Sequence, residues 1–178
     1  TISGRYGNAH PLYAPYDCFE TKDVKHVVIA GHWEKQWENL CKAIKRPDLL
    51  EDPRFNTMWG RSEHYSYLKS VITYWTTSIK RDEIVRILME YDVPVAPVNT
   101  VDDIFNCPQV ETREMLVETE HPIAGLMKIA GIPAKLSRTP GRIDSAAPLL
   151  GEHTDETLRG LLGYNDHKIH ELRSKKVI

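Results

Sequence analysis

The sequence predicts an α+β fold in two parts, with a boundary at about residue 112. Short runs of β-branched residues bounded by turn residues alternate with stretches in which apolar residues recur at i, i+3, i+4 and i+7. Residues 1–112 are predicted to form a small domain of helices with a short antiparallel sheet. Residues 113–178 are predicted to form a β-hairpin followed by two helices.

Three short extended segments are expected in the first part. Residues 1–24 are rich in Gly, Pro and Tyr and predict a loop that leads into a strand at Tyr16 to Glu20. The β-branched run "KHVVIAG", Lys25 to Gly31, is bounded by turn residues and predicts a second strand. The segment from Val93 to Asn99 alternates but contains two prolines, so it can only be an edge strand or an extended segment.

Helical periodicity fills the region between these strands. Apolar residues at helical spacing from Trp37 predict an amphipathic helix over 34–45 that ends before Pro47. The following stretch, 46–55, contains two prolines and predicts an ordered connection or a single turn. Further helices are predicted at about 62–77, around 84–91 with Asp82 and Glu83 in the first turn, and as two short pieces separated at Pro108.

The second part is predicted to be too small to fold alone. Its elements are a strand over 116–120, a turn over 121–125, a return strand over 126–130, a Pro-rich connector, and helices over 154–162 and 166–174 separated by a C′ glycine, Gly163. A hairpin and two helices of about sixty residues bury little apolar surface. We therefore expect this part to pack on the first part or on polypeptide outside this chain.

Composition excludes several classes of protein. The charge of −2, with both signs interleaved, gives no basic stripe for nucleic acid. No run of eighteen apolar residues could span a membrane, and the first residues lack the features of a signal peptide. Because they also lack Met, we expect the chain to begin inside a longer one. Three cysteines, Cys18, Cys41 and Cys107, favour buried thiols in a reducing compartment over disulfides or a zinc site.

One cluster could suggest metal binding or acid/base chemistry. His153 and Glu156, next to Glu152, can share a helical face, but their spacing indicates no third or fourth ligand. The structural interpretation is stronger, with Thr154 as N-cap and Asp155 and Glu156 in the first helical turn. We expect no metal site here.

The remaining candidates are weaker. His167 and His170 are expected on a solvated helix face, and the four tryptophans are expected mainly in the core. His10 lies in "GNAHP", a turn of the kind that brings backbone N–H groups near a ligand, although a surface loop without a role is the simpler interpretation. No P-loop, Gly-x-Ser-x-Gly or Gly-x-Gly-x-x-Gly motif is present.

Six segments, in order and spacing, resemble the C-terminal part of class III CoA-transferases. That family includes formyl-CoA and carnitine CoA-transferases and the related α-methylacyl-CoA racemases, and the second segment is more similar to the transferases. The segments are "GNAHPLYAPYDCFETKD", "QWENLCKAIKRPDLLEDPRF", "DVPVAPVNTVDDI", "EHPIAGLMKIAGIPAKLS", "PLLGEHTDETL" and "LGYNDHKIHEL".

The resemblance implies a cytoplasmic enzyme that moves CoA between an acyl-CoA and a free carboxylic acid, with no covalently bound cofactor. It implies that the hairpin and last helices return to a Rossmann-like large domain built from an N-terminal half, in interlocked dimers. The nucleophilic aspartate would belong to that half. We therefore expect no catalytic residue in this chain, and no activity from it alone.

The resemblance also implies a substrate loop, whose residues are Gly7, Asn8, Ala9, His10 and Pro11. Two positions depart from the family pattern: Val24 stands where a turn glycine is usual, and His32-Trp33 where Gly-Asn is common. Two alternatives stay open. The chain could be a non-catalytic subunit or assembly module of this fold, or part of a racemase-like enzyme that transfers a proton at the α-carbon.

Overall fold

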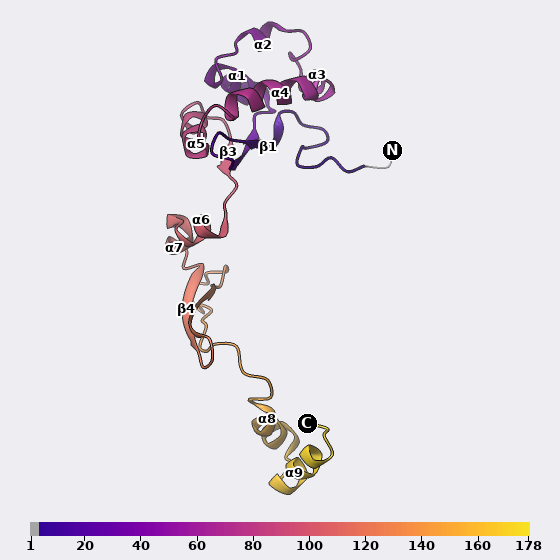
Figure 1. The fold of residues 1–178 in the computed structure, drawn as a ribbon, viewed down its shortest axis with the longest axis vertical. Coiled ribbons are helices and arrows are strands. Elements are labelled where there is room, and N and C mark those ends of the chain that lie inside the picture. Colours follow the sequence, from indigo (N-terminus) through magenta and orange to yellow (C-terminus); the bar gives the residue numbers. More distant parts are fainter. Residues whose placement is uncertain (1–3) are drawn as a thin grey trace. The chain divides into compact units, whose positions relative to one another are not determined.

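The computed structural model describes residues 4–178 and contains two compact units (Figure 1). Unit 1 extends to Thr100 and unit 2 begins at Val101. The elements of unit 1 are β1 (Tyr16–Glu20), β2 (His26–Ala30), α1 (Glu34–Ala43), α2 (Asp48–Glu51), α3 (Met58–Glu63), α4 (Tyr65–Thr76), α5 (Arg81–Glu90) and β3 (Val95–Pro97). The α+β prediction is confirmed.

Unit 1 is built on a three-stranded antiparallel sheet in the order β1-β2-β3. Tyr16 pairs with Ala30 at one end of β1, and Val27 pairs with Pro97 on β3. The edge position of β3 follows from Pro97 within the strand and Pro94 directly before it, neither of which has an N–H to donate to a further strand. All three predicted strands are confirmed.

The predicted helices of unit 1 are also present, and one more was not predicted. The proline-rich connection contains the single turn α2. The additional helix is α3, which begins where the side chain of Thr57 accepts a hydrogen bond from the backbone N–H of Gly60 at 3.1 Å. This N-cap stabilises a helix too short to show an apolar period.

A single apolar core lies in unit 1. Alternate residues of β1 and β2 point inward, and one face of α1, α4 and α5 packs over them. Its most buried members include Phe19, Val27, Ile29, Leu40, Phe55, Leu68, Ile72, Ile84 and Leu88. Of the tryptophans, Trp37 is buried and Trp75 packs on this core, but the core expectation is wrong for Trp33 and Trp59, which are 53% and 70% exposed.

One carboxylate is buried at the edge of this core and ties β1 to α4. Asp17 accepts hydrogen bonds from the Tyr65 hydroxyl at 2.8 Å, the Lys69 ammonium at 2.6 Å and the backbone N–H of Cys18 at 2.7 Å. Burial, with help from Asp17, raises the pKa of the Tyr65 hydroxyl. The carboxylate therefore has the partners that a buried charge requires.

Arg61 is the largest fully buried side chain of unit 1, with 0% exposure. Its guanidinium donates to the carbonyl oxygens of Ala14 at 3.2 Å, Phe55 at 3.1 Å and His32 at 2.6 Å. It also donates to Glu34 Oε1 at 3.3 Å. Burial lowers the pKa of Arg61, yet arginine keeps its charge, so one fixed cation joins three separate segments of the chain.

Val24 adopts a backbone conformation that β-branched residues rarely take, with φ of 58°. It closes a tight turn between β1 and β2, in which its N–H donates to the carbonyl of Thr21 at 2.9 Å. Glycine, which is usual here in the family that the sequence resembles, suits such a φ because it has no Cβ to clash. The departure noted in the sequence is therefore a site of backbone strain.

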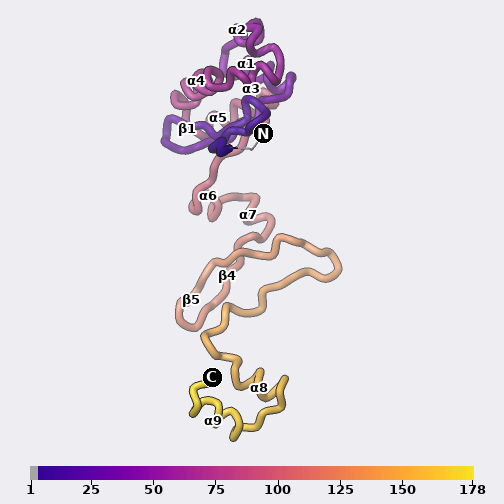
Figure 2. The backbone as a smooth tube through the Cα atoms, turned by 90° about the vertical axis from the view of Figure 1, so that its right-hand side faces the viewer, coloured from indigo at the N-terminus to yellow at the C-terminus, as the bar shows by residue number. Residues whose placement is uncertain are grey.

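Unit 2 has the predicted elements. They are α6 (Val101–Phe105), α7 (Pro108–Thr112), β4 (Leu116–His121), β5 (Gly125–Ala130), α8 (Thr154–Leu162) and α9 (Asp166–Ser174). β4 and β5 form an antiparallel hairpin, and the segment between β5 and α8 has no regular structure (Figure 2). Gly163 ends α8 with φ of 63°, as predicted.

The N-cap prediction for α8 is wrong by one residue. His153 holds the cap position without a side-chain hydrogen bond, and Thr154 is the first helical residue. The turn at Gly151, with φ of 76°, lets the Thr154 N–H donate to the Gly151 carbonyl and so starts the helix earlier.

Unit 2 has no apolar core of its own. Among residues 101–178 only Gly131 and Ile169 are buried. Many of its large apolar side chains are exposed, among them Phe105, Ile123, Leu126, Leu136, Leu150, Leu161 and Leu162. This confirms the sequence argument that the hairpin and helices bury too little surface by themselves.

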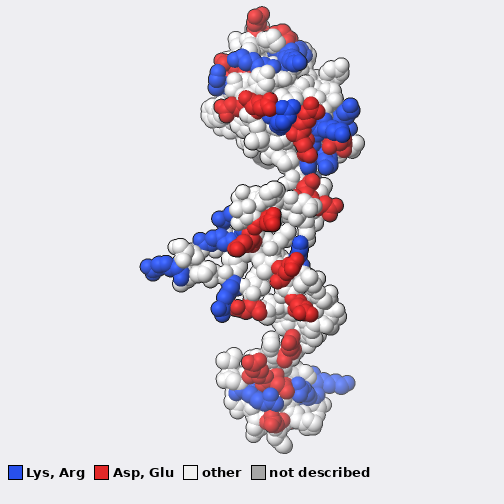
Figure 3. Space-filling model, turned by 90° about the vertical axis from the view of Figure 1, so that its left-hand side faces the viewer, with Lys and Arg blue, Asp and Glu red and all other residues white. Residues whose placement is uncertain are grey.

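The distribution of charge and the state of the cysteines can be compared with the sequence expectations. On the face shown in Figure 3, Lys and Arg lie beside Asp and Glu instead of forming a basic stripe. The three cysteines are unpaired, but the prediction of buried thiols holds fully only for Cys41, whose pKa burial raises to about 12. In the part of the chain that the structure describes, no helix is long and apolar enough to cross a membrane.

We predict that Arg61→Lys lowers the free energy of unfolding of unit 1 by about 2–4 kcal/mol, since a single ammonium nitrogen cannot reach the three carbonyls that Nε, Nη1 and Nη2 of Arg61 contact. Urea denaturation followed by tryptophan fluorescence measures this. The control is Arg86→Lys, which changes an exposed i,i+4 pair with Glu90 and should shift stability by less than about 0.5 kcal/mol. Equal effects of the two variants would contradict the role of Arg61.

We predict that Val24→Gly raises the free energy of unfolding by about 0.5–1 kcal/mol. Relief of the left-handed strain, worth about 1–2 kcal/mol, is partly offset by the greater entropy of glycine in the unfolded chain. Thermal unfolding of both proteins measures the difference. Lys22→Gly, in the same turn but without a positive φ, should instead be destabilising. A destabilised Val24→Gly variant would refute the strain.

Candidate functional site

The predicted substrate loop lies on unit 1 and is an irregular segment before β1. Gly7 takes a φ of 64° at its turn, with no atom near the place of a Cβ. Asn8 and Pro11 are exposed, whereas Ala9 and His10 are half-buried. The five residues are consecutive, and only His10 brings a titratable side chain.

The structure fixes the orientation of the His10 ring. The ring Nδ1 accepts hydrogen bonds from the backbone N–H groups of Leu12 at 3.2 Å and Tyr13 at 3.1 Å. The backbone N–H of His10 donates to the Tyr16 carbonyl at 2.9 Å. Since both partners of Nδ1 are donors, the proton of the neutral ring is on Nε2. The residue thus closes the loop on itself.

His10 belongs to a ring cluster, which comprises His10, Tyr13, Tyr16, His32 and Trp33. His10 stacks on Tyr13 with ring centroids 4.4 Å apart and on Tyr16 at 5.6 Å. His32 stacks on the same two tyrosines at 5.1 Å and 5.5 Å. Trp33 lies against His32 at 5.3 Å. The rings of His10, Tyr13, Tyr16 and His32 are therefore nearly parallel and support one another.

His32 is the inner histidine of the ring cluster. Its Nδ1 is buried and has no hydrogen-bond partner among residues 4–178. Burial, followed by the neighbouring His10 and Arg61, lowers the pKa of His32. The ring is therefore held in its neutral form at neutral pH and contributes packing instead of charge.

Helix α3 holds residues 12–15, the segment that joins the substrate loop to β1. Arg61 reaches the carbonyl of Ala14, and the Ser62 hydroxyl donates to the carbonyl of Leu12 at 2.7 Å. The N–H of Gly31 donates to the Pro15 carbonyl at 2.9 Å. Hydrogen bonds from a helix and from the residue after β2 thus fix the segment that follows the loop.

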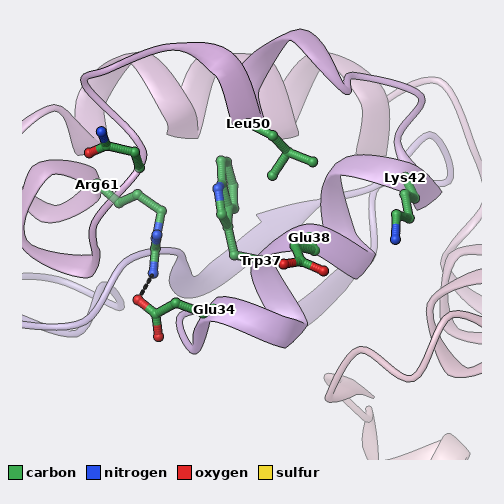
Figure 4. A pocket seen from close by; sticks show the side chains of 7 residues that line it. Glu34, Trp37, Glu38, Lys42, Leu50 and Arg61 are labelled. Atoms are coloured by element: carbon green, nitrogen blue, oxygen red, sulfur yellow. Dashed lines mark hydrogen bonds and ion pairs between the residues drawn. The ribbon is translucent and has the colours of Figure 1, made fainter.

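A pocket of about 270 Å³ opens on the other side of Arg61. Figure 4 shows the Trp37 ring standing between the Arg61 guanidinium and Leu50, with Glu34 paired to Arg61. The indole N–H of Trp37 is buried without a partner in the described residues. The charges of Glu34 and Glu38 oppose those of Arg61 and Lys42, so the pocket favours neither sign of ligand.

The second sequence candidate, His153 with Glu152 and Glu156, is exposed to solvent. His153 Nδ1 lies 3.5 Å from Glu156 Oε2 in a pair that is 58% and 84% exposed, and Glu152 accepts the N–H of Leu149. His167 and His170 are exposed on α9. Residues 4–178 contain no group of three or more His, Cys, Asp or Glu side chains placed to hold a metal ion.

Sequence reasoning missed the partners of the loop. Nothing in the sequence around Tyr13 and Tyr16 indicated a role for these two rings. No pattern around Arg61 distinguishes it from a surface arginine. The sequence did mark His32-Trp33 as unusual, and the structure places both against the loop. That departure from the family pattern was the one available signal.

Comparison with known proteins identifies relatives along most of the chain. It is 42% identical over 155 residues to a succinyl-CoA:mesaconate CoA-transferase of Haloarcula marismortui, covering 86% of this chain and 38% of that protein. It is 32% identical over 177 residues to a succinyl-CoA–D-citramalate CoA-transferase of Chloroflexus aurantiacus, covering 99% and 44%. A formyl-CoA:oxalate CoA-transferase of Escherichia coli is 37% identical over 145 residues, covering 82% and 34%.

A solved structure also matches most of this chain. The crystal structure of a CAIB/BAIF family protein from Brucella suis matches 90% of this chain and 41% of its own, with a TM-score of 0.76 and 29% identity. The chain thus spans about two fifths of the length of its relatives. The model of CoA-transferase family III matches residues 1–154. The chain therefore belongs to CoA-transferase family III.

Proposed function

We propose that this chain is the C-terminal portion of an enzyme that transfers CoA between an acyl-CoA and a dicarboxylic acid. The family match carries the proposal. The absence of an apolar core in unit 2 supports the view that the chain is one portion of a larger enzyme. The dicarboxylic acid follows from the relatives, since succinyl-CoA, mesaconate, citramalate and oxalate all derive from such acids. CoA thioesters are then substrates, with no covalently bound cofactor.

The proposed chemistry requires a nucleophile that this chain does not supply. An aspartate carboxylate attacks the acyl-CoA thioester and releases the CoA thiolate, which leaves a mixed anhydride. The thiolate then attacks the aspartyl carbonyl, frees the first acid and gives an enzyme thioester, on which the acceptor acid acts in reverse order. We place that aspartate in an N-terminal half outside this chain.

The two units then have different tasks. Unit 1 presents the substrate loop, Gly7 to Pro11, to the reacting acyl group. The return segment, residues 113–178, packs its exposed apolar side chains on a Rossmann-like large domain formed by the N-terminal half. Two complete chains would interlock as a homodimer. The three unpaired cysteines support a reducing, cytoplasmic location.

We predict that the chain alone does not exchange CoA between succinyl-CoA and mesaconate above the uncatalysed rate, because it lacks the nucleophile. Coexpression with the N-terminal half encoded upstream should restore exchange, and chromatography of the CoA esters measures both. Turnover by the chain alone would contradict the assignment of the aspartate. An upstream stop codon would favour a non-catalytic subunit instead.

We predict that the completed enzyme does not exchange the α-hydrogen of a 2-methylacyl-CoA with solvent deuterium, since transfer of CoA breaks no C–H bond. Mass spectrometry of the thioester after incubation in D₂O gives the measurement. Enzyme-dependent deuterium incorporation without CoA transfer would support the racemase alternative and refute the transferase.

A further inference from the structure

The fixed tautomer of His10 leaves one donor free for a ligand. Within residues 4–178, the hydrogen bonds of its ring are both made by Nδ1, with Leu12 and Tyr13. The neutral ring must carry its proton on Nε2, which has no partner among those residues. Stacking on Tyr13 and Tyr16 fixes the plane of the ring, and a flip within that plane would break both hydrogen bonds to Nδ1.

We propose that His10 determines specificity by donating a hydrogen bond from Nε2 to the non-reacting carboxylate of the dicarboxylic substrate. This inference rests on the proposed function and adds the residue that would recognise the second carboxylate. A carboxylate is the fitting partner, because it only accepts hydrogen bonds and a bond from an oriented N–H to an ionised group is stronger than one between neutral groups.

The surroundings of the loop support a fixed donor. The side chains of Arg61 and Ser62 donate to the carbonyls of Ala14 and Leu12, so the chain directly after His10 is attached to the folded core. A donor that is oriented before the ligand arrives loses little conformational entropy on binding. No bond is made or broken at His10, which leaves the chemistry to the carboxylate nucleophile.

Two substitutions distinguish the loss of the Nε2 donor from the loss of the hydrogen bonds that Nδ1 makes within the loop segment. In His10→Asn, the amide oxygen can take the place of Nδ1 and accept the two backbone N–H groups, but nothing remains at the position of Nε2. In His10→Gln, the amide nitrogen can reach the position of Nε2, while the acceptor for Leu12 and Tyr13 is lost. His26→Asn, at an exposed histidine of β2, is the matched control.

The test uses the enzyme completed by its N-terminal half, with succinate and butyrate as competing acceptors. His10→Asn should lower kcat/KM for succinate about tenfold or more through KM, with little change for butyrate, because one charge-assisted hydrogen bond is lost. His10→Gln should recover part of the preference for succinate, and His26→Asn should match the wild type. An equal loss for both acids, or no loss, would overturn the inference.

The assay also separates this inference from the function it rests on. If the wild-type enzyme shows no exchange with any acid, both the proposed function and the inference are contradicted. If the wild type transfers CoA and His10→Asn keeps the preference for succinate, only the inference is contradicted. Nitrogen-15 NMR of the ring supplies an independent check: a proton on Nε2 is expected, and a proton on Nδ1 would overturn the inference.

Discussion

The distribution of buried apolar surface constrains everything else in this chain. The core lies within unit 1, from Phe19 to Val93, whereas unit 2 buries one large apolar side chain, Ile169. A two-stranded hairpin and four helices, of which the longest have nine residues, cannot offset the entropy of ordering residues 101–178 by burial of this extent. We therefore infer that the stable fold of unit 2 depends on a surface outside it, whereas unit 1 has an apolar core of its own.

Within unit 1, the buried guanidinium of Arg61 connects that core to the loop. Three carbonyl groups from distant segments share one cation, so the position of the loop is tied to the integrity of the core. The stacked rings extend this connection to His10. An irregular loop on a rigid support is a common arrangement for binding residues, and here the support is a helix, a strand end and four side-chain rings.

The sequence predicted most of the elements, because apolar period, proline and glycine act locally. The edge strand at Val95, the turn at α2 and the end of α8 at Gly163 all follow from such signals. It could not predict α3, which depends on one side-chain cap, or the burial of Arg61, which depends on contacts between residues up to 47 positions apart. It placed His10 in a loop but could not assign its proton, since that depends on two backbone N–H groups folded against the ring.

Hydrogen exchange of the isolated chain, followed by mass spectrometry, tests the division between the two units most directly. We expect slow exchange in β2, α4 and α5, and exchange close to that of an unfolded chain in β4, β5, α8 and α9. Addition of the N-terminal half should then protect the second group. Slow exchange throughout unit 2 in the isolated monomer would show that it folds without an external surface, and would contradict the account.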